Sequence, residues 1–356
     1  MKLTDLGWSS FFEEKFSVYV QSGHCVGRVA AEYRHLYGLL TASGEVLAQV
    51  SGKMRHQSAG RGDFPTVGDW VVIEEFPGDK AMIHAVLPRK SKFSRKVAGN
   101  EFEEQIVAAN VDLVFLVMSL NQDFNLRRLE RYLVVAWESG STPVVILSKS
   151  DLCDDLDEKV AQVQSIAVGV PIHVISSIQQ QGLEALSPYL VHGQTVALLG
   201  SSGVGKSTLI NTLLGKEVQR VHEVRENDAR GRHTTTNREL FLLPEGGIII
   251  DTPGMRELHF WEGDHGFDTT FTDIQELADK CFFNDCRHQQ EPGCAVQQAI
   301  TAGLLDLTRL DSYRNLQREI AITALNLDKK QLRRAENKRR GRASYKSRRS
   351  RIIKKH

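Results

Sequence analysis

A glycine-rich segment at residues 200–208 combines residue types that suit phosphate binding. It follows an apolar run at 196–199 and leads into a run with helical spacing at 208–214. Glycines let the backbone approach a phosphate closely, and successive N–H groups at a helix start then point at the anion. An ordinary turn before a helix is the alternative. The strand–loop–helix context favours a nucleotide-binding loop, formed by Gly200, Ser201, Ser202, Gly203, Val204, Gly205, Lys206, Ser207 and Thr208.

Charged and hydroxyl groups in this loop and beyond it suit Mg²⁺ and the γ-phosphate. Lys206 supplies a positive charge at the β- and γ-phosphates, and the Ser207 hydroxyl can bind Mg²⁺. The segment Asp251-Thr-Pro-Gly254 follows a second buried strand. Asp251 would hold the metal through water, and the Gly254 N–H would meet the γ-phosphate. A simple turn is the alternative for this segment.

A polar segment at 222–237 lies between the phosphate loop and Asp251. It contains the run Gly231-Arg-His-Thr-Thr-Thr236. Its place in the chain is that of a switch loop, which the γ-phosphate would order. One threonine would complete the Mg²⁺ shell, with Thr235 as the first candidate and Thr234 as the second.

Ser148-Lys149-x-Asp151 is the candidate reader of the base. A carboxylate can accept the guanine N1–H and N2–H₂ together, while a lysine stem covers the ring. Adenine would leave that carboxylate unpaired. The usual guanine motif has Asn where this chain has Ser148, and a helix N-cap is the alternative role for the tetrapeptide. Ser176-Ser177 suits the last loop around the base.

The elements that would carry these motifs alternate between strand and helix from residue 106 onward. Repeated strand–helix units predict a doubly wound, mostly parallel sheet with ligands at the carboxyl ends of the strands. Each polar motif named above follows such a strand. The expected strands are 111–120, 143–147, 172–175, 196–199, 239–243 and 247–250, and the expected helices are 126–138, 155–168, 183–189 and 208–214.

The first hundred residues show a different sequence pattern. Residues 25–90 hold five short alternating runs separated by turn residues, which predicts a small barrel of the oligonucleotide-binding (OB) type, with an SH3-like barrel as the alternative. Residues 97–105 read as a polar link. Aromatic side chains in 1–24 are spaced for one face of a helix that packs on the barrel or serves as a docking surface, namely Trp8, Phe11, Phe12 and Phe16.

A cysteine and histidine cluster follows within a predicted helical region at 267–328. The pattern Cys281-x4-Cys286-x-His288-x5-Cys294 supplies three thiolates and one imidazole. Four such ligands suit a closed tetrahedral Zn²⁺ site with a structural role, and buried or free cysteines are the alternative. The cysteine count of five is odd and low, which argues against a disulfide framework and for a reducing cytoplasm.

The net charge of +1 hides two opposite regions. Residues 329–356 hold 14 Lys and Arg residues and one acidic residue, which leaves 31 basic and 43 acidic residues elsewhere. Such a tail suggests a polyanionic partner, or else a solvated segment without one. No apolar run approaches the roughly 20 residues that span a bilayer, and the N-terminus lacks the features of a secretory signal. We therefore expect a cytoplasmic protein without membrane contact.

The order of these motifs is unusual. The base reader and the Ser176-Ser177 loop precede the phosphate loop, the threonines and Asp251, whereas regulatory GTPases have the reverse order of these two groups. Together with the barrel, the Gly231–Thr236 run and the zinc spacing, the sequence resembles the ribosome small-subunit-dependent GTPase A (RsgA/YjeQ) family of circularly permuted GTPases. The expected units are an N-terminal extension (1–24), the OB-like barrel (25–96), the permuted GTPase domain (97–265), a zinc-binding helical domain (266–328) and a basic disordered tail (329–356).

The resemblance implies GTP and GDP as ligands, one structural Zn²⁺, and slow GTP hydrolysis that the small ribosomal subunit stimulates. It also implies a role in late maturation of that subunit, contact with its rRNA and release of ribosome-binding factor A. Met255 stands where many GTPases have a water-orienting glutamine, and the resemblance points to His233 for that role. The alternative is that His233 contacts only rRNA or its own loop. Lys206, His233 and Thr235 are thus the catalytic candidates.

Two other functions remain open at this level. Ser148 leaves room for an RNA-dependent P-loop ATPase. A non-enzymatic rRNA-binding scaffold that holds GTP as a structural ligand is the other. Nothing in the sequence demands more than a monomer.

Overall fold

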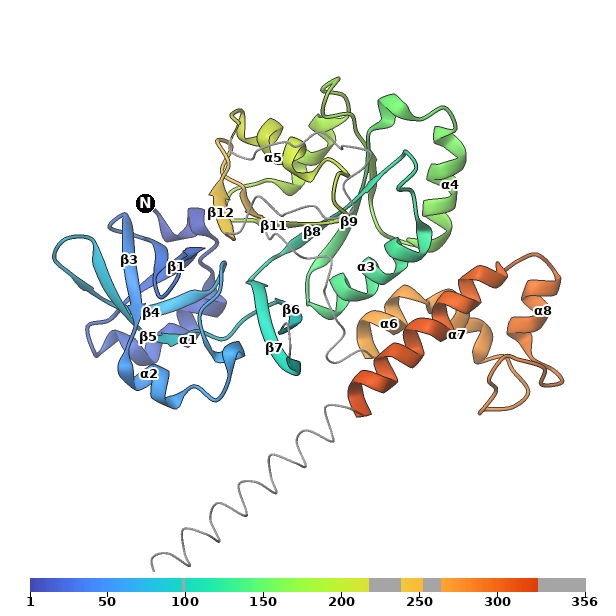
Figure 1. The fold of residues 1–356 in the computed structure, drawn as a ribbon, viewed down its shortest axis with the longest axis horizontal. Coiled ribbons are helices and arrows are strands. Elements are labelled where there is room, and N and C mark those ends of the chain that lie inside the picture. The colour runs from blue at the N-terminus through green and yellow to red at the C-terminus, as the bar shows by residue number, and fades with distance from the viewer. Residues whose placement is uncertain (98–99, 218–237, 252–263, 326–356) are drawn as a thin grey trace, which may run out of the picture.

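The computed structural model describes residues 1–97, 100–217, 238–251 and 264–325. Three lobes follow one another in chain order (Figure 1). A blue β-rich lobe contains the N-terminus, a green to yellow α/β lobe lies in the middle, and an orange helical lobe lies beside helix α3.

The first lobe is a closed five-stranded barrel. Strand β1 pairs with both β2 and β4, so the order β1–β2–β3–β5–β4 returns to β1. Only β3 and β5 are parallel. This is the predicted OB-type arrangement, and it is confirmed. The elements are β1 (Cys25–Glu32), β2 (Tyr37–Thr41), β3 (Glu45–Val50), β4 (Trp70–Phe76), β5 (Lys80–Val86), α2 (Gly52–Gln57) and the 3₁₀ helix Arg61–Asp63.

The N-terminal helix packs on this barrel. A 3₁₀ helix (Leu3–Leu6) precedes α1 (Ser10–Val20). Phe12 is 1% exposed, and the rings of Trp8 and Trp70 lie with their centroids 4.7 Å apart in an edge-to-face arrangement. The aromatic face therefore packs against the barrel. Of the two predicted roles, packing and docking, the structure shows packing.

The stretch after the barrel is a β-hairpin. Strands β6 (Lys92–Val97) and β7 (Asn100–Ala109) pair antiparallel. The prediction of a mere polar link at 97–105 is wrong, because its residues pair with a partner strand. Arg89, just before β6, binds Asp69 through two N–H donors at 2.7 Å each. Arg89 therefore supports the barrel.

The middle lobe has the predicted parallel sheet. Its strand order is β10–β9–β8–β11–β13–β12, with only β12 antiparallel to its neighbour. The strands are β8 (Leu113–Ser119), β9 (Thr142–Ser148), β10 (Ile172–Val174), β11 (Thr195–Leu199), β12 (Glu239–Leu242) and β13 (Ile248–Asp251). The helices are α3 (Leu126–Glu138), α4 (Leu156–Ile166), α5 (Lys206–Leu214) and the 3₁₀ helices Ser150–Leu152 and Leu183–Tyr189.

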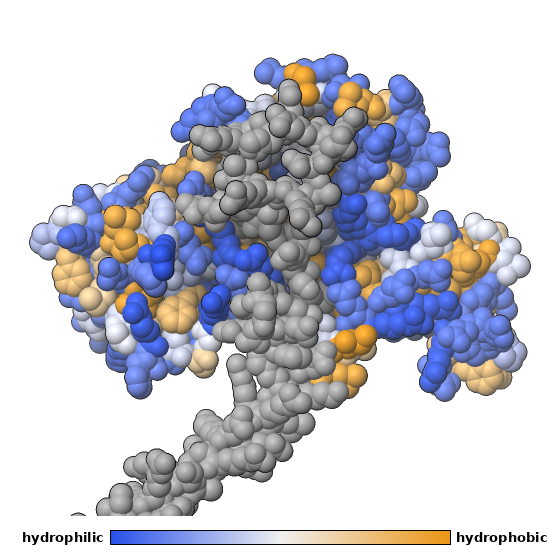
Figure 2. All heavy atoms as spheres, viewed as in Figure 1, coloured by the Kyte–Doolittle hydropathy of each residue, from blue (hydrophilic) through white to orange (hydrophobic). Residues whose placement is uncertain are grey.

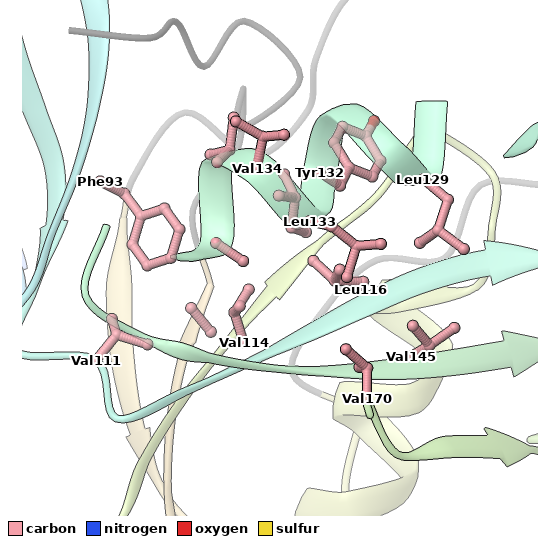
Figure 3. Close-up of a cluster of buried hydrophobic side chains, with 14 of the residues drawn as sticks. Phe93, Val111, Val114, Leu116, Leu129, Tyr132, Leu133, Val134, Val145 and Val170 are labelled. Atoms are coloured by element: carbon pink, nitrogen blue, oxygen red, sulfur yellow. The ribbon is translucent and has the colours of Figure 1, made fainter. Parts of the chain in front are cut away.

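Helix α3 buries its apolar side on this sheet. Figure 3 shows Leu129 and Leu133 of α3 pointing toward Leu116 of β8 and Val145 of β9. The helix begins at the predicted residue because the Asn125 side chain accepts a hydrogen bond from the Arg128 N–H at 2.9 Å.

The third lobe is held to α3 by ion pairs. It contains α6 (Asp264–Thr270), α7 (Thr272–Ala278), α8 (Ala295–Thr301) and a long helix at 307–325. Arg309 of that helix is 3% exposed and donates to Glu130 of α3 at 2.8 Å and to Asp273 of α7 at 2.9 Å. Arg131 donates to both carboxylate oxygens of Glu319, at 2.6 and 2.8 Å.

A buried arginine joins the barrel to the α/β lobe. Arg28 of β1 is 1% exposed. Its guanidinium donates to the Thr195 hydroxyl at 2.8 Å, to the Asn110 carbonyl at 3.2 Å and to the Leu6 carbonyl. Burial lowers the pKa of Arg28 to about 10, against the opposing effect of Asp112 and Asp69, so the group stays charged near neutral pH.

The surface is mixed in character. Figure 2 shows a largely hydrophilic face with scattered hydrophobic groups among the described residues. Within the described ranges, no helix combines the length and the apolar character that crossing a bilayer requires.

Candidate nucleotide site and metal centre

The phosphate loop connects β11 to α5, as predicted. Helix α5 begins at Lys206, so its free N–H groups face the loop. The Lys206 ammonium donates to the carbonyls of Gly200 at 2.8 Å and Ser201 at 2.6 Å. Ser207 and Thr208 are half-exposed in the first turn of α5. The loop has the form of an anion-binding site.

All three glycines of this loop are needed for geometric reasons. Gly203 and Gly205 have backbone φ angles of 75° and 101°, which residues other than glycine rarely adopt. A Cβ on Gly200 would lie 2.3 Å from the Val117 carbonyl oxygen of β8. The loop conformation therefore depends on glycine at these positions.

Ser148 supports the phosphate loop. Its hydroxyl donates to the Val204 carbonyl at 2.6 Å, and the residue is 4% exposed. That bond ties the end of β9 to the loop after β11. The prediction that Ser148 contacts the base gains no geometric support from this orientation and stays a prediction.

Asp151 and Ser176 meet at the neighbouring strand ends. The Ser176 hydroxyl donates to Asp151 Oδ1 at 2.5 Å, although 25 residues separate them. Ser176 is fully buried, whereas Asp151, Lys149 and Ser177 are half-buried. The Ser176 hydroxyl thus holds the Asp151 carboxylate in place, and the position of this carboxylate suits the predicted guanine contact.

Asp251 ends β13, which lies beside β11 in parallel register. Its carboxylate therefore belongs to the same edge of the sheet as the phosphate loop. His233, Thr234, Thr235 and Gly254 lie outside the described residues. Their predicted roles stay predictions.

The cysteine and histidine cluster comes together as predicted. The ligand atoms of Cys281, Cys286, His288 and Cys294 all lie within 4.8 Å of one another. Sulfurs on a tetrahedral Zn²⁺ with bonds of about 2.3 Å would be about 3.8 Å apart. The Sγ atoms of Cys281 and Cys294 are 3.9 Å apart, and His288 Nδ1 is 3.6 Å from each. The donor set and its spacing fit zinc.

The backbone holds the histidine of this cluster in place. His288 has a left-handed φ of 59°. Its carbonyl accepts hydrogen bonds from Gln297 of α8 and Arg314 of the 307–325 helix. These bonds stabilise a conformation that costs a non-glycine residue free energy.

Comparisons with known proteins agree with this geometry. Residues 86–261 match the RsgA GTPase family model. The protein named small ribosomal subunit biogenesis GTPase RsgA 2 of Lactiplantibacillus plantarum is 49% identical over 306 residues, 86% of each chain. That named small ribosomal subunit biogenesis GTPase RsgA of Opitutus terrae is 47% identical over 338 residues, 92% of each chain. The chain belongs to the RsgA GTPase family.

Solved structures give the same fold. The crystal structure of YjeQ from Thermotoga maritima has 28% identity and a TM-score of 0.62, over 84% of this chain and 99% of that chain. YloQ, a circularly permuted GTPase, has 25% identity and a TM-score of 0.60, over 84% of this chain and 95% of that one. This RsgA-family protein is therefore a GTP hydrolase with a circularly permuted GTPase fold.

Sequence reasoning missed one neighbour of the phosphate loop. Arg128, in the first turn of α3, donates to the Ser201 hydroxyl and to Asp123 Oδ1, the latter at 2.7 Å. Both Asp123 and Arg128 follow the carboxyl end of β8, which lies next to β11. Their position after a strand end was the one available signal in the sequence of this RsgA-family chain.

Proposed function

We propose that this GTPase acts on the small ribosomal subunit during late maturation, and that the subunit stimulates a slow intrinsic GTP hydrolysis. The observation that carries this proposal is the match to the Opitutus terrae protein, whose name states small ribosomal subunit biogenesis, over 92% of each chain. Similarity over nearly the whole chain includes the barrel and the zinc cluster as well as the GTPase lobe.

In this proposal, the ligands are GTP or GDP with Mg²⁺. The phosphate loop binds the phosphates, Asp151 and Lys149 hold guanine, and Ser176 and Ser177 close the base pocket. Ser207, Asp251 and Thr235 hold Mg²⁺, and Gly254 meets the γ-phosphate. The hydrogen bond from Ser176 to Asp151 supports the guanine assignment, because it holds the carboxylate that would accept the base.

Hydrolysis needs a group that positions water. Met255 cannot do so, and we assign this role to His233, whose neutral imidazole can accept a proton from water or orient it. Replacing His233 by alanine should reduce subunit-stimulated turnover roughly 100-fold, with GTP affinity unchanged. Equal stimulated turnover in the variant and the wild type would refute the role.

The remaining parts of the proposal concern partners. The tail at 329–356, whose excess of Lys and Arg contrasts with the acidic remainder of the chain, supports contact with rRNA phosphates. Release of ribosome-binding factor A, a cytoplasmic location and a monomeric state complete the proposal. The Cys₃His cluster would hold one structural Zn²⁺, which fixes the loop 281–294 between α7 and α8.

The decisive experiment is phosphate release from GTP with and without purified small ribosomal subunits. We expect subunits to raise kcat at least about tenfold, the size of a barrier reduction near 1.4 kcal/mol. Turnover that stays the same at saturating subunits would contradict the proposal. Large ribosomal subunits at the same concentration are the matched control.

A further inference from the structure

We propose that Arg128 is a positioning residue for the phosphate loop and that it acts through the Ser201 hydroxyl. It lies on α3, 73 residues before Ser201 in the chain. The inference rests on the loop being the nucleotide site. It does not depend on the ribosomal part of the proposed function.

The first step of the argument is the position of Arg128. The helix N-cap Asn125 accepts from the Arg128 N–H, which fixes the first turn of α3 beside the phosphate loop. Long side chains on a helix lean toward its N-terminus, and here this direction leads to Asp123 and Ser201. The location of the guanidinium thus follows from the start of the helix.

The second step is the orientation of the guanidinium. Asp123 accepts from Arg128 at 2.7 Å through Oδ1 and also through its backbone carbonyl at 3.5 Å. A carboxylate partner holds the planar guanidinium in one direction and offsets part of its charge. Arg128 is one-third exposed, so the ion pair alone adds little to stability.

The third step concerns Ser201 itself. Its hydroxyl accepts from Arg128 and its carbonyl accepts from Lys206 at 2.6 Å. Two cationic side chains from different elements therefore hold one residue of the loop. Since Ser201 directly follows Gly200, this contact sets the direction in which the loop leaves β11.

A loop fixed before the ligand arrives loses less conformational freedom on binding. Replacing Arg128 by glutamine should therefore lower the affinity for GTP and the affinity for GDP by the same factor. A hydrogen bond from a charged donor corresponds to roughly a tenfold change in the dissociation constant. Replacing it by lysine, which keeps a charged donor, should restore part of the lost affinity.

The test is a double-mutant cycle on the full chain, with fluorescent GTP and GDP and without ribosomal subunits. The variants are Arg128→Gln, Ser201→Ala and the two combined. We expect Arg128→Gln to have little further effect once Ser201 is alanine. A loss of affinity in the combined variant equal to the product of the two single losses would overturn the proposal, as would wild-type affinity in Arg128→Gln.

Two controls separate this outcome from other failures. Arg127→Gln removes the neighbouring guanidinium, which contacts Glu130 and Thr308, and should leave nucleotide affinity unchanged. Lys206→Ala should abolish binding if the loop is the nucleotide site. Binding that survives Lys206→Ala would contradict the site itself, whereas a silent Arg128→Gln beside a sensitive Lys206→Ala would contradict only the role of Arg128.

Discussion

The contact between Asp151 and Ser176 joins two loops that the chain order keeps apart. Asp151 follows β9, and Ser176 follows β10. Because these strands are adjacent and parallel, their carboxyl ends share one edge of the sheet. The Ser176 hydroxyl donates to Oδ1 of Asp151, so a contact within the protein orients the carboxylate.

Exchange of Asp151 for asparagine should therefore change the preferred base. The asparagine amide group can donate to the C2 carbonyl of xanthine, which stands where guanine has its N2 amino donor. We expect GTP affinity to fall at least about 100-fold, and xanthosine triphosphate to bind better than GTP. Competition of labelled GTP by GTP, xanthosine triphosphate and ATP measures this.

Asp154→Asn is the matched control for that exchange, since Asp154 is exposed a few residues further along the chain. It should retain the wild-type preference. Effective competition by ATP in the wild type would contradict the role of Asp151 in selecting the base.

Residue types alone predicted the glycine-rich loop between a strand and a helix, and they predicted which three cysteines and histidine would come together, because those motifs have nearly fixed spacing. They did not reveal that Ser148 turns toward the Val204 carbonyl, or that Arg128 reaches Ser201. Both contacts join positions more than 50 residues apart. A local pattern carries no information on such pairs until the sheet order is known.

Among the elements, strands buried on both faces and helices with clear caps agreed with prediction. Helix α3 has its predicted bounds, since Asn125 marks its start. The helix expected at 183–189 is a 3₁₀ helix that contains Pro188, which has no N–H to donate. The hairpin of β6 and β7 was missed because polar strands look like links until their partner is found.

The Cys₃His cluster is the part of the molecule whose stability would depend most directly on a bound ligand, the proposed Zn²⁺. It spans the short segment 281–294 between α7 and α8. We expect one Zn²⁺ per chain in wild type, and less than about 0.1 in Cys286→Ser, because a closed site needs all four ligands. Metal analysis measures this. Chelation should lower the melting temperature of wild type and have little effect on Cys286→Ser.

Cys153→Ser is the matched control for that measurement. Cys153 lies in the α/β lobe beside Asp155 and Lys159, away from the cluster. It should keep full zinc content. Equal chelator sensitivity in Cys286→Ser and wild type would contradict the zinc assignment.

At the scale of the whole molecule, Arg28 connects the lobes. Its guanidinium serves acceptors from the N-terminal segment, the loop before β8 and strand β11. It also lies 5.7 Å from the Trp70 ring centroid. The barrel and the α/β lobe therefore share a polar junction with matched donors and acceptors.

Replacing Arg28 by methionine should destabilise the protein as a whole. The change leaves buried acceptors without a donor, which costs about 2–4 kcal/mol of unfolding free energy. Urea unfolding followed by tryptophan fluorescence measures this, since Trp70 lies at the junction. Arg34→Met is the matched control, because Arg34 is exposed. If both substitutions lowered the free energy of unfolding by the same small amount, Arg28 would not stabilise the junction between the lobes.

The contact between β1 and β12 has a consequence for the behaviour of the chain in solution. Strand β12 is the last strand on its side of the α/β sheet, and Ala31 of β1 pairs with Glu239 at its outer edge. An ion pair from Arg238 to Glu32, at 3.1 Å, lies next to this pairing. Uncovered edge strands recruit strands of other molecules. The contact with the barrel therefore covers part of an edge that, left open, would be available to a strand of another molecule.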